Sequence, residues 1–134
     1  MTDGFFPIGK IYLSLDDISL ALQNIDIARG SGPDEISPLI LRNCFQSLIA
    51  PLYIIFNKSL TEGYFPVRWK TSYINLIFKS GSRNNVENYR GVAILPTIAK
   101  LFESMVSKEL TTHFRQFFST DQHGFVKGIS TVTN

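Results

Sequence analysis

The first half of the chain carries apolar residues at the spacing of helices. Ser14 can cap a helix, with Asp17 three positions later as in a capping box. The apolar positions that follow on one face are Leu15, Ile18, Leu22 and Ile25. Because residues 29–34 form a stretch typical of turns, we expect this helix to end near Ala28.

Two further helices are predicted before the middle of the chain. Ser37 precedes a proline, which fits the first position of a short helix over 38–43. A longer apolar pattern predicts a helix over 46–62, closed by Gly63. Its expected buried residues are Leu48, Leu52, Ile55, Phe56, Ser59 and Leu60. Pro51 fits this helix only within the first turn, because proline lacks the N–H that later turns use.

The second half begins with two short segments rich in β-branched and aromatic residues, 72–78 and 90–95. We expect them to form a buried antiparallel hairpin with a long connection over 79–89. A helix over 96–115 follows, with the clearest helical periodicity in the chain. Its apolar positions are Ile98, Leu101, Phe102, Met105, Val106 and Leu110. The pattern predicts an α+β fold, rich in helices, with a two-stranded antiparallel hairpin.

Charge is distributed unevenly along the 134 residues, although the net charge is only +2. Residues 1–67 have a balance of −3, and residues 68–100 have six Lys and Arg against Glu87 alone, a balance of +5. A basic middle third favours a polyanionic partner such as nucleic acid or a triphosphate, and a solvated basic face explains the charge equally well. No apolar run approaches the roughly 18 residues of a membrane span, so no membrane partner is expected.

Signatures of metal or nucleophilic chemistry are missing from the sequence. His113 and His123 have no cysteine or carboxylate at ligand spacing, which favours surface or core-edge histidines. Asp16 and Asp17 stand at a helix start, where carboxylates stabilise the helix dipole. Cys44 follows an apolar run and is expected to be a small buried residue. We therefore predict no catalytic residue and no metal ligand in this chain.

The connection between the two predicted strands has the residues of a phosphate site. Lys79 and Arg90 stand at its two ends, where antiparallel pairing would bring them onto neighbouring strands. We expect their charged ends on one side of the hairpin and Ile77 and Ile94 on its apolar side. Arg83, in the middle, is a candidate contact for a backbone phosphate. Asn84, Asn85 and Asn88 add neutral donors.

Tyr89 lies beside these cations and has two possible roles. Its ring can stack on a nucleobase or fill the connection between the strands. Of the two roles, we favour filling.

Four segments, in order, resemble reverse transcriptases of non-LTR retrotransposons, particularly those of jockey-type elements. The resemblance covers about residues 14–134. The segments are Gly32-Pro-Asp-Glu-Ile-Ser-Pro-Leu-Ile-Leu41, Leu52 to Ser80 with Gly63-Tyr-Phe-Pro66 and Ile77-Phe-Lys-Ser-Gly81, Glu87-Asn-Tyr-Arg-Gly-Val-Ala-Ile-Leu95 with Lys100-Leu-Phe-Glu103, and Asp121-Gln-His-Gly-Phe125 with Gly128 and Ser130-Thr131.

The resemblance implies that residues 1–134 are the N-terminal fingers part of a reverse transcriptase domain. In such polymerases the basic hairpin clamps the triphosphate of the incoming nucleotide, and Lys79 and Arg90 match the clamping positions. Arg83 and Lys127 would contact the template. The implied partners of the complete enzyme are an RNA template, a DNA primer and a deoxynucleotide triphosphate.

The resemblance also implies a palm that this sequence does not contain. An Asp-containing strand and a Tyr/Phe-x-Asp-Asp turn would follow Asn134 and hold the magnesium ions of the complete enzyme. No acidic pair in the chain replaces those aspartates. We therefore expect the 134-residue chain alone to be inactive as a polymerase.

Three residues depart from the family pattern. Glu35 replaces the glycine after Gly-Pro-Asp, which predicts a strained turn, and Gly91 replaces the proline after Asn-Tyr-Arg. Val126 replaces an arginine after Gly-Phe. These losses leave two alternatives open, a repurposed nucleic-acid-binding module and a non-functional retrotransposon relic.

Overall fold

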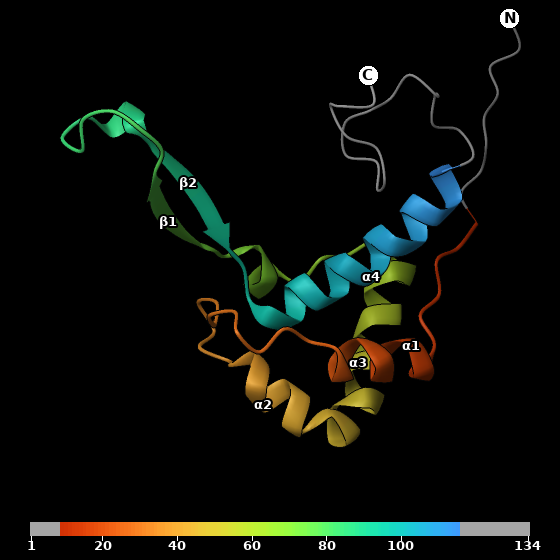
Figure 1. Ribbon diagram of the computed structural model, residues 1–134. Helices are drawn as coiled ribbons and strands as arrows, with labels where there is room; N and C mark the ends of the chain where they lie inside the picture. The colour runs from red at the N-terminus through yellow and green to blue at the C-terminus, as the bar shows by residue number, and fades with distance from the viewer. Residues whose placement is uncertain (1–8, 116–134) are drawn as a thin grey trace, which may run out of the picture.

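The computed structural model describes residues 9–115, which form a helical body and a projecting hairpin (Figure 1). The elements are α1 (Leu15–Gln23), α2 (Pro38–Asn43), α3 (Phe45–Glu62), the 3-10 turn η1 (Val67–Lys70), β1 (Tyr73–Phe78), the 3-10 turn η2 (Val86–Asn88), β2 (Tyr89–Ile94) and α4 (Thr97–Phe114). β1 and β2 make a two-stranded antiparallel sheet. The predicted α+β fold is confirmed.

α1 begins as predicted and ends earlier than predicted. The Ser14 hydroxyl accepts from the Asp17 N–H at 3.1 Å, and the Asp17 carboxylate accepts from the Ser14 N–H at 3.0 Å, which completes a capping box. The helix stops at Gln23, and the next residue, Asn24, is its C-cap, with both its N–H and its side-chain amide donated to the Leu20 carbonyl. The expected end near Ala28 was therefore wrong.

α2 has the predicted start and end, with the Ser37 hydroxyl accepting from the Leu39 N–H at 3.2 Å. α3 contains Pro51 as its seventh residue, so the expectation that proline fits only the first turn was wrong. Pro51 is exposed, and the carbonyl that loses a partner belongs to exposed Ser47, which water can reach. Gly63 ends α3 in the left-handed conformation with φ 62°, as its position predicted.

α4 matches its predicted bounds to within a residue. Its N-cap is Pro96, and its last residue is followed by Arg115 at the C-cap. Among the described helices, none is long and apolar enough to cross a membrane.

The apolar core lies where α1, α3 and α4 meet. Its buried residues are Leu13, Ile18, Leu22, Leu41, Leu52, Phe56, Leu101, Phe102 and Met105. Phe56 is fully buried, and its ring centroid lies 4.9 Å from that of Phe102. Leu15 and Ile55 were expected in this core and are instead 49% and 43% exposed. The helical periodicity thus predicted which face of each helix is buried, but it assigned too many residues to that face.

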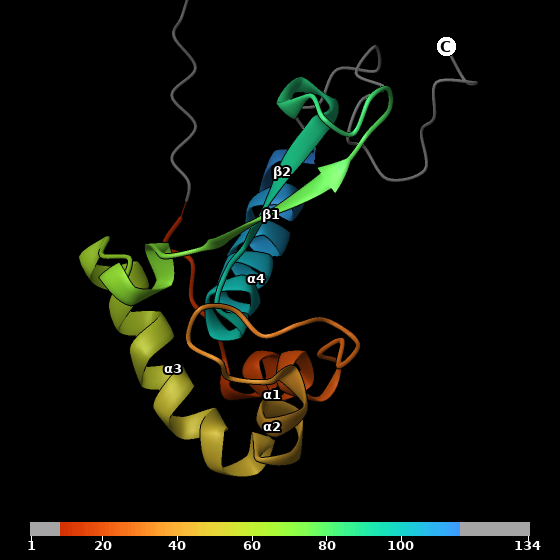
Figure 2. The same ribbon diagram turned by 90° about the vertical axis from the view of Figure 1, so that its left-hand side faces the viewer.

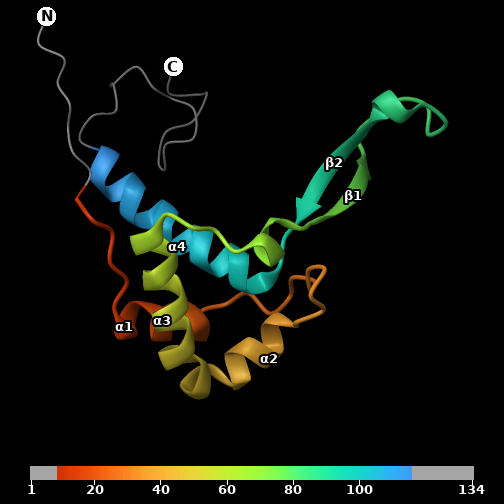
Figure 3. The ribbon, with the colours of Figure 1, turned by 180° about the vertical axis from the view of Figure 1, so that it is seen from behind.

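The hairpin extends away from the helices, as the opposite views of Figures 1 and 3 show. Ile74, Leu76 and Ile77 are 62%, 60% and 52% exposed. The expectation of buried strands was therefore wrong. Apolar β-branched residues favour a strand locally, but burial requires a second layer, and no described element covers either face of this sheet.

The loop between α1 and α2 passes beneath the start of α4 and fixes the base of the hairpin (Figure 2). The Thr97 hydroxyl donates to the Ile36 carbonyl at 3.1 Å. Gly32 lies so close to the 95–96 backbone that a Cβ on it would stand 2.5 Å from the Leu95 oxygen. Glu35 has φ 58°, the one positive φ of a non-glycine residue in the described chain, which confirms the strained turn predicted there.

Candidate anion-binding hairpin

The strand register assigns the side chains of the hairpin to two faces. Arg90 is opposite Ile77, and Tyr89 is opposite Phe78. Directly opposed residues of an antiparallel pair share a face, and successive residues alternate between faces. We call one side the Arg90 face, with Tyr73, Asn75, Ile77, Arg90, Val92 and Ile94, and the other the Phe78 face, with Ile74, Leu76, Phe78, Tyr89, Gly91 and Ala93.

Lys79 continues the ladder just beyond β1. Its N–H donates to the Asn88 carbonyl at 2.7 Å, so strand alternation assigns its side chain to the Arg90 face. Lys79 and Arg90 are both exposed. Ile77 and Ile94 lie on this same face, so the expectation that they form a separate apolar side was wrong. Side chains two positions apart on a strand lie on the same face, so Ile77 shares the face of Lys79. Ile77 is also paired with Arg90 across the two strands and therefore shares its face as well.

The connection between the strands is held by its own polar groups. The Asn88 side-chain amide donates to the Ser82 carbonyl at 2.8 Å, and the Asn85 side-chain oxygen accepts from the Glu87 N–H at 3.2 Å. Gly81 adopts φ 89°, a conformation that favours glycine. The Asn88 amide donor and the Asn85 side-chain oxygen therefore shape the loop.

Arg83 lies on the Phe78 face. The carbon at the centre of its guanidinium stands 5.3 Å from the centroid of the Phe78 ring. The Tyr89 hydroxyl donates to the Arg83 carbonyl at 2.9 Å, and the Tyr89 and Phe78 rings meet edge to face at 5.5 Å. Tyr89 thus fills the connection, which was the favoured expectation.

No described carboxylate neutralises the hairpin cations. The ion pairs within residues 9–115 are Arg29 with Asp26 and Lys58 with Glu62, both in the helical body. Cations that share a face and have no acidic partner attract an anion, and the attraction at an exposed site falls as salt rises. The exposed cations of the hairpin thus have the charge that a phosphate-binding site requires.

The acidic residues of the body have structural roles. Hydrogen bonds from the Ser14 hydroxyl and N–H lower the pKa of Asp17, which confirms capping for this residue. The Ala28 N–H and the Arg29 side chain lower the pKa of Asp26. Within residues 9–115, no three His, Cys, Asp or Glu side chains lie together as a metal site would require.

Cys44 and His113 are the remaining residues considered for chemistry. Cys44 is exposed, so the expectation of burial was wrong. It is the C-cap of α2 and also the residue before α3. His113 stands in the last turn of α4, where its ring meets that of Phe114 edge to face at 5.3 Å.

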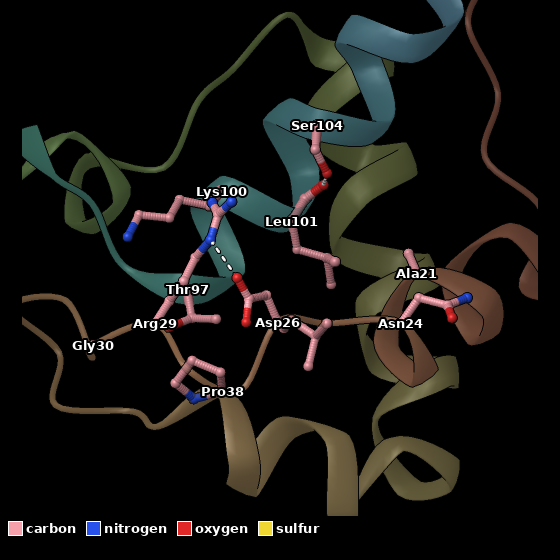
Figure 4. A pocket seen from close by; sticks show the side chains of 11 residues that line it. Ala21, Asn24, Asp26, Arg29, Gly30, Pro38, Thr97, Lys100, Leu101 and Ser104 are labelled. Carbon is pink, nitrogen blue, oxygen red and sulfur yellow. Dashed lines mark hydrogen bonds and ion pairs between the residues drawn. The ribbon is translucent and has the colours of Figure 1, made fainter.

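Sequence reasoning missed a hollow of about 280 Å³ between α1, the following loop and α4 (Figure 4). Arg29 and Lys100 line it from distant parts of the sequence, and the Arg29 Nε lies 3.0 Å from the Asp26 carboxylate. The turn-rich stretch after α1 was the available signal, but nothing in the sequence indicated that it packs beside Lys100.

The remaining candidate residues lie outside the described part of the chain. These are Lys127, predicted to contact the template, Val126, which departs from the family pattern, and His123. The structure neither tests nor changes those predictions.

Comparisons with known proteins agree with the resemblance. No family model matches the chain. The RNA-directed DNA polymerase from mobile element jockey of Drosophila melanogaster is 28% identical over 101 residues, which are 75% of this chain and 11% of that protein. The probable RNA-directed DNA polymerase from transposon BS of the same species is 28% identical over 123 residues, 90% of this chain and 14% of that protein.

A third relative comes from another insect. The retrovirus-related Pol polyprotein from type-1 retrotransposable element R1 of Bradysia coprophila is 25% identical over 122 residues, 89% of this chain and 12% of that protein. The chain thus spans only a small part of the length of these relatives. Their names confirm the resemblance drawn from the sequence: the chain is similar, over most of its length, to part of the RNA-directed DNA polymerases of jockey-type and related mobile elements.

Proposed function

We propose that the chain acts as the fingers part of an RNA-directed DNA polymerase from a mobile element. Its hairpin holds the triphosphate of the incoming deoxynucleotide through Lys79 and Arg90. The observation that carries this proposal is the strand register, which assigns both cations to one face, where no described carboxylate forms an ion pair with them. The similarity to RNA-directed DNA polymerases supports it.

The two side chains suit different parts of a triphosphate. The Lys79 ammonium is a compact charge on a flexible stem, and the Arg90 guanidinium presents a planar fork that can bind two phosphate oxygens together. Negative charge builds on the leaving pyrophosphate as the new bond forms. Cations fixed beside that charge stabilise the transition state more than the ground state.

The same proposal includes the other partners of the complete polymerase. An RNA template would contact Arg83 and Lys127 through its backbone phosphates, without readout of sequence. The primer and the magnesium ions would be held by other parts of the polymerase, where the aspartates of the palm are expected.

Kinetics of a polymerase that joins this chain to the active palm of a relative would test the triphosphate clamp. Lys79→Ala and Arg90→Ala should each lose roughly 1.5–3 kcal/mol, the value of a hydrogen bond to a charged group. This corresponds to about one to two decades in kcat/KM for the nucleotide. Arg83→Ala is the matched control, because it removes a cation of the same hairpin from the opposite face.

The outcomes distinguish an anion site at Lys79 and Arg90 from an anion site at Arg83. Arg83→Ala should weaken template binding modestly, mainly at low salt, and leave nucleotide kinetics unchanged. If Lys79→Ala and Arg90→Ala keep normal nucleotide kinetics while Arg83→Ala loses them, the clamp assignment is wrong. An arginine at position 126, introduced as Val126→Arg, should raise activity if the missing family cation matters.

A further inference from the structure

The hollow between α1, the loop that follows it and α4 gathers positive charge from three sources (Figure 4). Arg29 lines it from the loop, and Lys100 lines it from the start of α4. Thr97, the first residue of α4, lines it as well, so the positive end of the helix dipole lies at its edge. Among the described residues, no side chain caps this end of α4. Together these groups favour an anion in the hollow.

The Arg29 guanidinium is held in place and still has donors to offer. Its Nε donates to the Asp26 carboxylate at 3.0 Å, and the Ala28 N–H donates to the same carboxylate at 3.1 Å. Within residues 9–115, the two terminal nitrogens of Arg29 have no hydrogen-bond partner. Lys100 forms no ion pair with a described carboxylate. Two cations and one carboxylate therefore line the hollow, a balance of +1, beside a fixed fork of donors.

Much of the remaining lining of the hollow is apolar. Ile25 is half-buried, and Leu101 and Pro38 are buried. Figure 4 shows Ala21 on the other side of the hollow from Lys100. The volume of about 280 Å³ is close to the lower limit of sites that take small organic ligands. The lining thus suits a ligand with an anionic head and a compact apolar body.

We propose that this hollow binds a small organic phosphate, a monoester with a compact apolar body. A phosphate has three terminal oxygens, so it can accept from the Arg29 fork through two of them and from Lys100 through the third. A carboxylate has only two oxygens and would use the three donors less fully. The body of the ligand lies against Ile25 and Leu101. This site is separate from the hairpin, so it goes beyond the proposed function.

Titration of the full 134-residue chain with phenyl phosphate, followed by methyl NMR signals, tests this inference. The signals of Ile25 and Leu101 should shift and reach saturation, because both side chains line the hollow. The signal of Leu52, a core residue that does not line the hollow, should not move. If the signals of Ile25 and Leu101 stay unchanged, the inference is wrong.

A pair of lysine variants tests the source of the binding. Lys100→Gln should weaken phenyl phosphate about tenfold, as expected for the loss of one hydrogen bond to a charged group. Lys58→Gln is the matched control, because Lys58 pairs with Glu62 on α3 and does not line the hollow. It should leave binding unchanged. Equal losses in the two variants would attribute the binding to overall charge and overturn the site.

Variants of Asp26 and Arg29 provide a readout that a structural role would not move. Asp26→Asn keeps an oxygen for the Arg29 Nε but raises the charge balance of the hollow to about +2. It should strengthen binding about two- to fivefold, the range for an exposed charge pair. Arg29→Lys keeps the charge and loses the fork, so it should weaken binding less than Arg29→Gln does. Full binding in Arg29→Gln would contradict the proposal.

Two further ligands and one hairpin variant define the chemical class and the place of the site. Inorganic phosphate lacks the apolar body and benzoate lacks the third oxygen, so both should bind more weakly than phenyl phosphate. If either binds as tightly, the proposed class is wrong. The shifts of Ile25 and Leu101 should persist in Arg90→Gln. If they are lost there, the phosphate binds at the hairpin, and this inference fails while the triphosphate clamp is supported.

Discussion

The helical body and the hairpin are stabilised in different ways. In the body, side chains from α1, α3 and α4 bury one another, and Phe56 and Ile18 lose all contact with solvent. In the hairpin, both faces are open, and the strands are held by their ladder and by the polar groups of the connecting loop. The two regions meet at Gly32 and the backbone of residues 95–96.

This difference separates the determinants of stability from those of function. Burial fixes the body, so its buried residues are replaceable only by others of similar size and polarity. The hairpin contributes few buried atoms, so its charges and aromatic residues are free to serve a ligand. Substitutions in the two regions should therefore have opposite consequences, large for folding in one and large for binding in the other.

The largest effect on stability is expected at Phe56. Phe56→Ala should lower the free energy of unfolding by about 3–5 kcal/mol, because it removes a fully buried ring that packs on Phe102. Ile77→Ala in the exposed hairpin is the comparison and should change it by at most about 0.5 kcal/mol. Urea unfolding followed by circular dichroism measures both. Similar losses for the two variants would contradict the division into body and hairpin.

A smaller loss is expected at the joint between the two regions. Gly32→Ala should destabilise the chain by about 1–3 kcal/mol, because the new methyl group would meet the backbone of Leu95 and Pro96. Gly30→Ala is a matched control two residues away, where a Cβ would meet nothing within 4 Å. Thermal unfolding of the two variants should differ clearly. Equal melting temperatures would show that the loop does not press on this backbone.

The strained turn should respond in the opposite direction. Glu35→Gly should raise the free energy of unfolding by about 0.5–1 kcal/mol, because relief of the left-handed strain exceeds the added entropy of the unfolded chain. Glu35→Ala removes the same carboxylate but keeps a Cβ, and it should give no gain. A gain in both variants would attribute the effect to charge rather than to the backbone.

The smallest effect concerns pH and the cap of α1. Asp17 has a lower pKa in the folded chain because Ser14 donates to its carboxylate. Its contribution to stability is therefore present above its unfolded pKa of about 3.9, and it is lost as the pH falls through the lower folded pKa. In Asp17→Asn, the decrease in the free energy of unfolding at acid pH that comes from protonation of Asp17 should be absent. Unfolding measured at a series of pH values checks this. If the pH dependence of stability is the same in Asp17→Asn as in the original chain, the cap of α1 does not contribute to the loss of stability at acid pH.

The sequence predicted the helices well because their signals are local. Ser14 with Asp17, Ser37 before a proline, and Gly63 each set a helix boundary through contacts within a few residues. Burial was harder to predict, since it depends on the layer that packs against an element. Ile77 was assigned to a buried apolar side and is 52% exposed.

The candidate site was predictable in composition and only partly in geometry. The spacing of Lys79 and Arg90 indicated that they would meet at the base of the connection, and pairing of β1 with β2 provides the frame for this. The position of Arg83 over Phe78 was not predictable, because it depends on how the loop folds back on the strands. Because of that contact, Arg83 lies on the Phe78 face, while Lys79 and Arg90 lie on the Arg90 face.

Heteronuclear NMR of the arginine side chains during titration with inorganic triphosphate tests the central claim most directly. The proposed clamp predicts a saturable shift of the Arg90 side-chain signal, weakened by Lys79→Ala, with the Arg83 signal nearly unchanged. A shift of Arg83 with Arg90 unchanged would contradict the account, because it would move the anion site from the Arg90 face to the tip. So would equal shifts of both signals, which are expected if the triphosphate only samples a solvated basic surface.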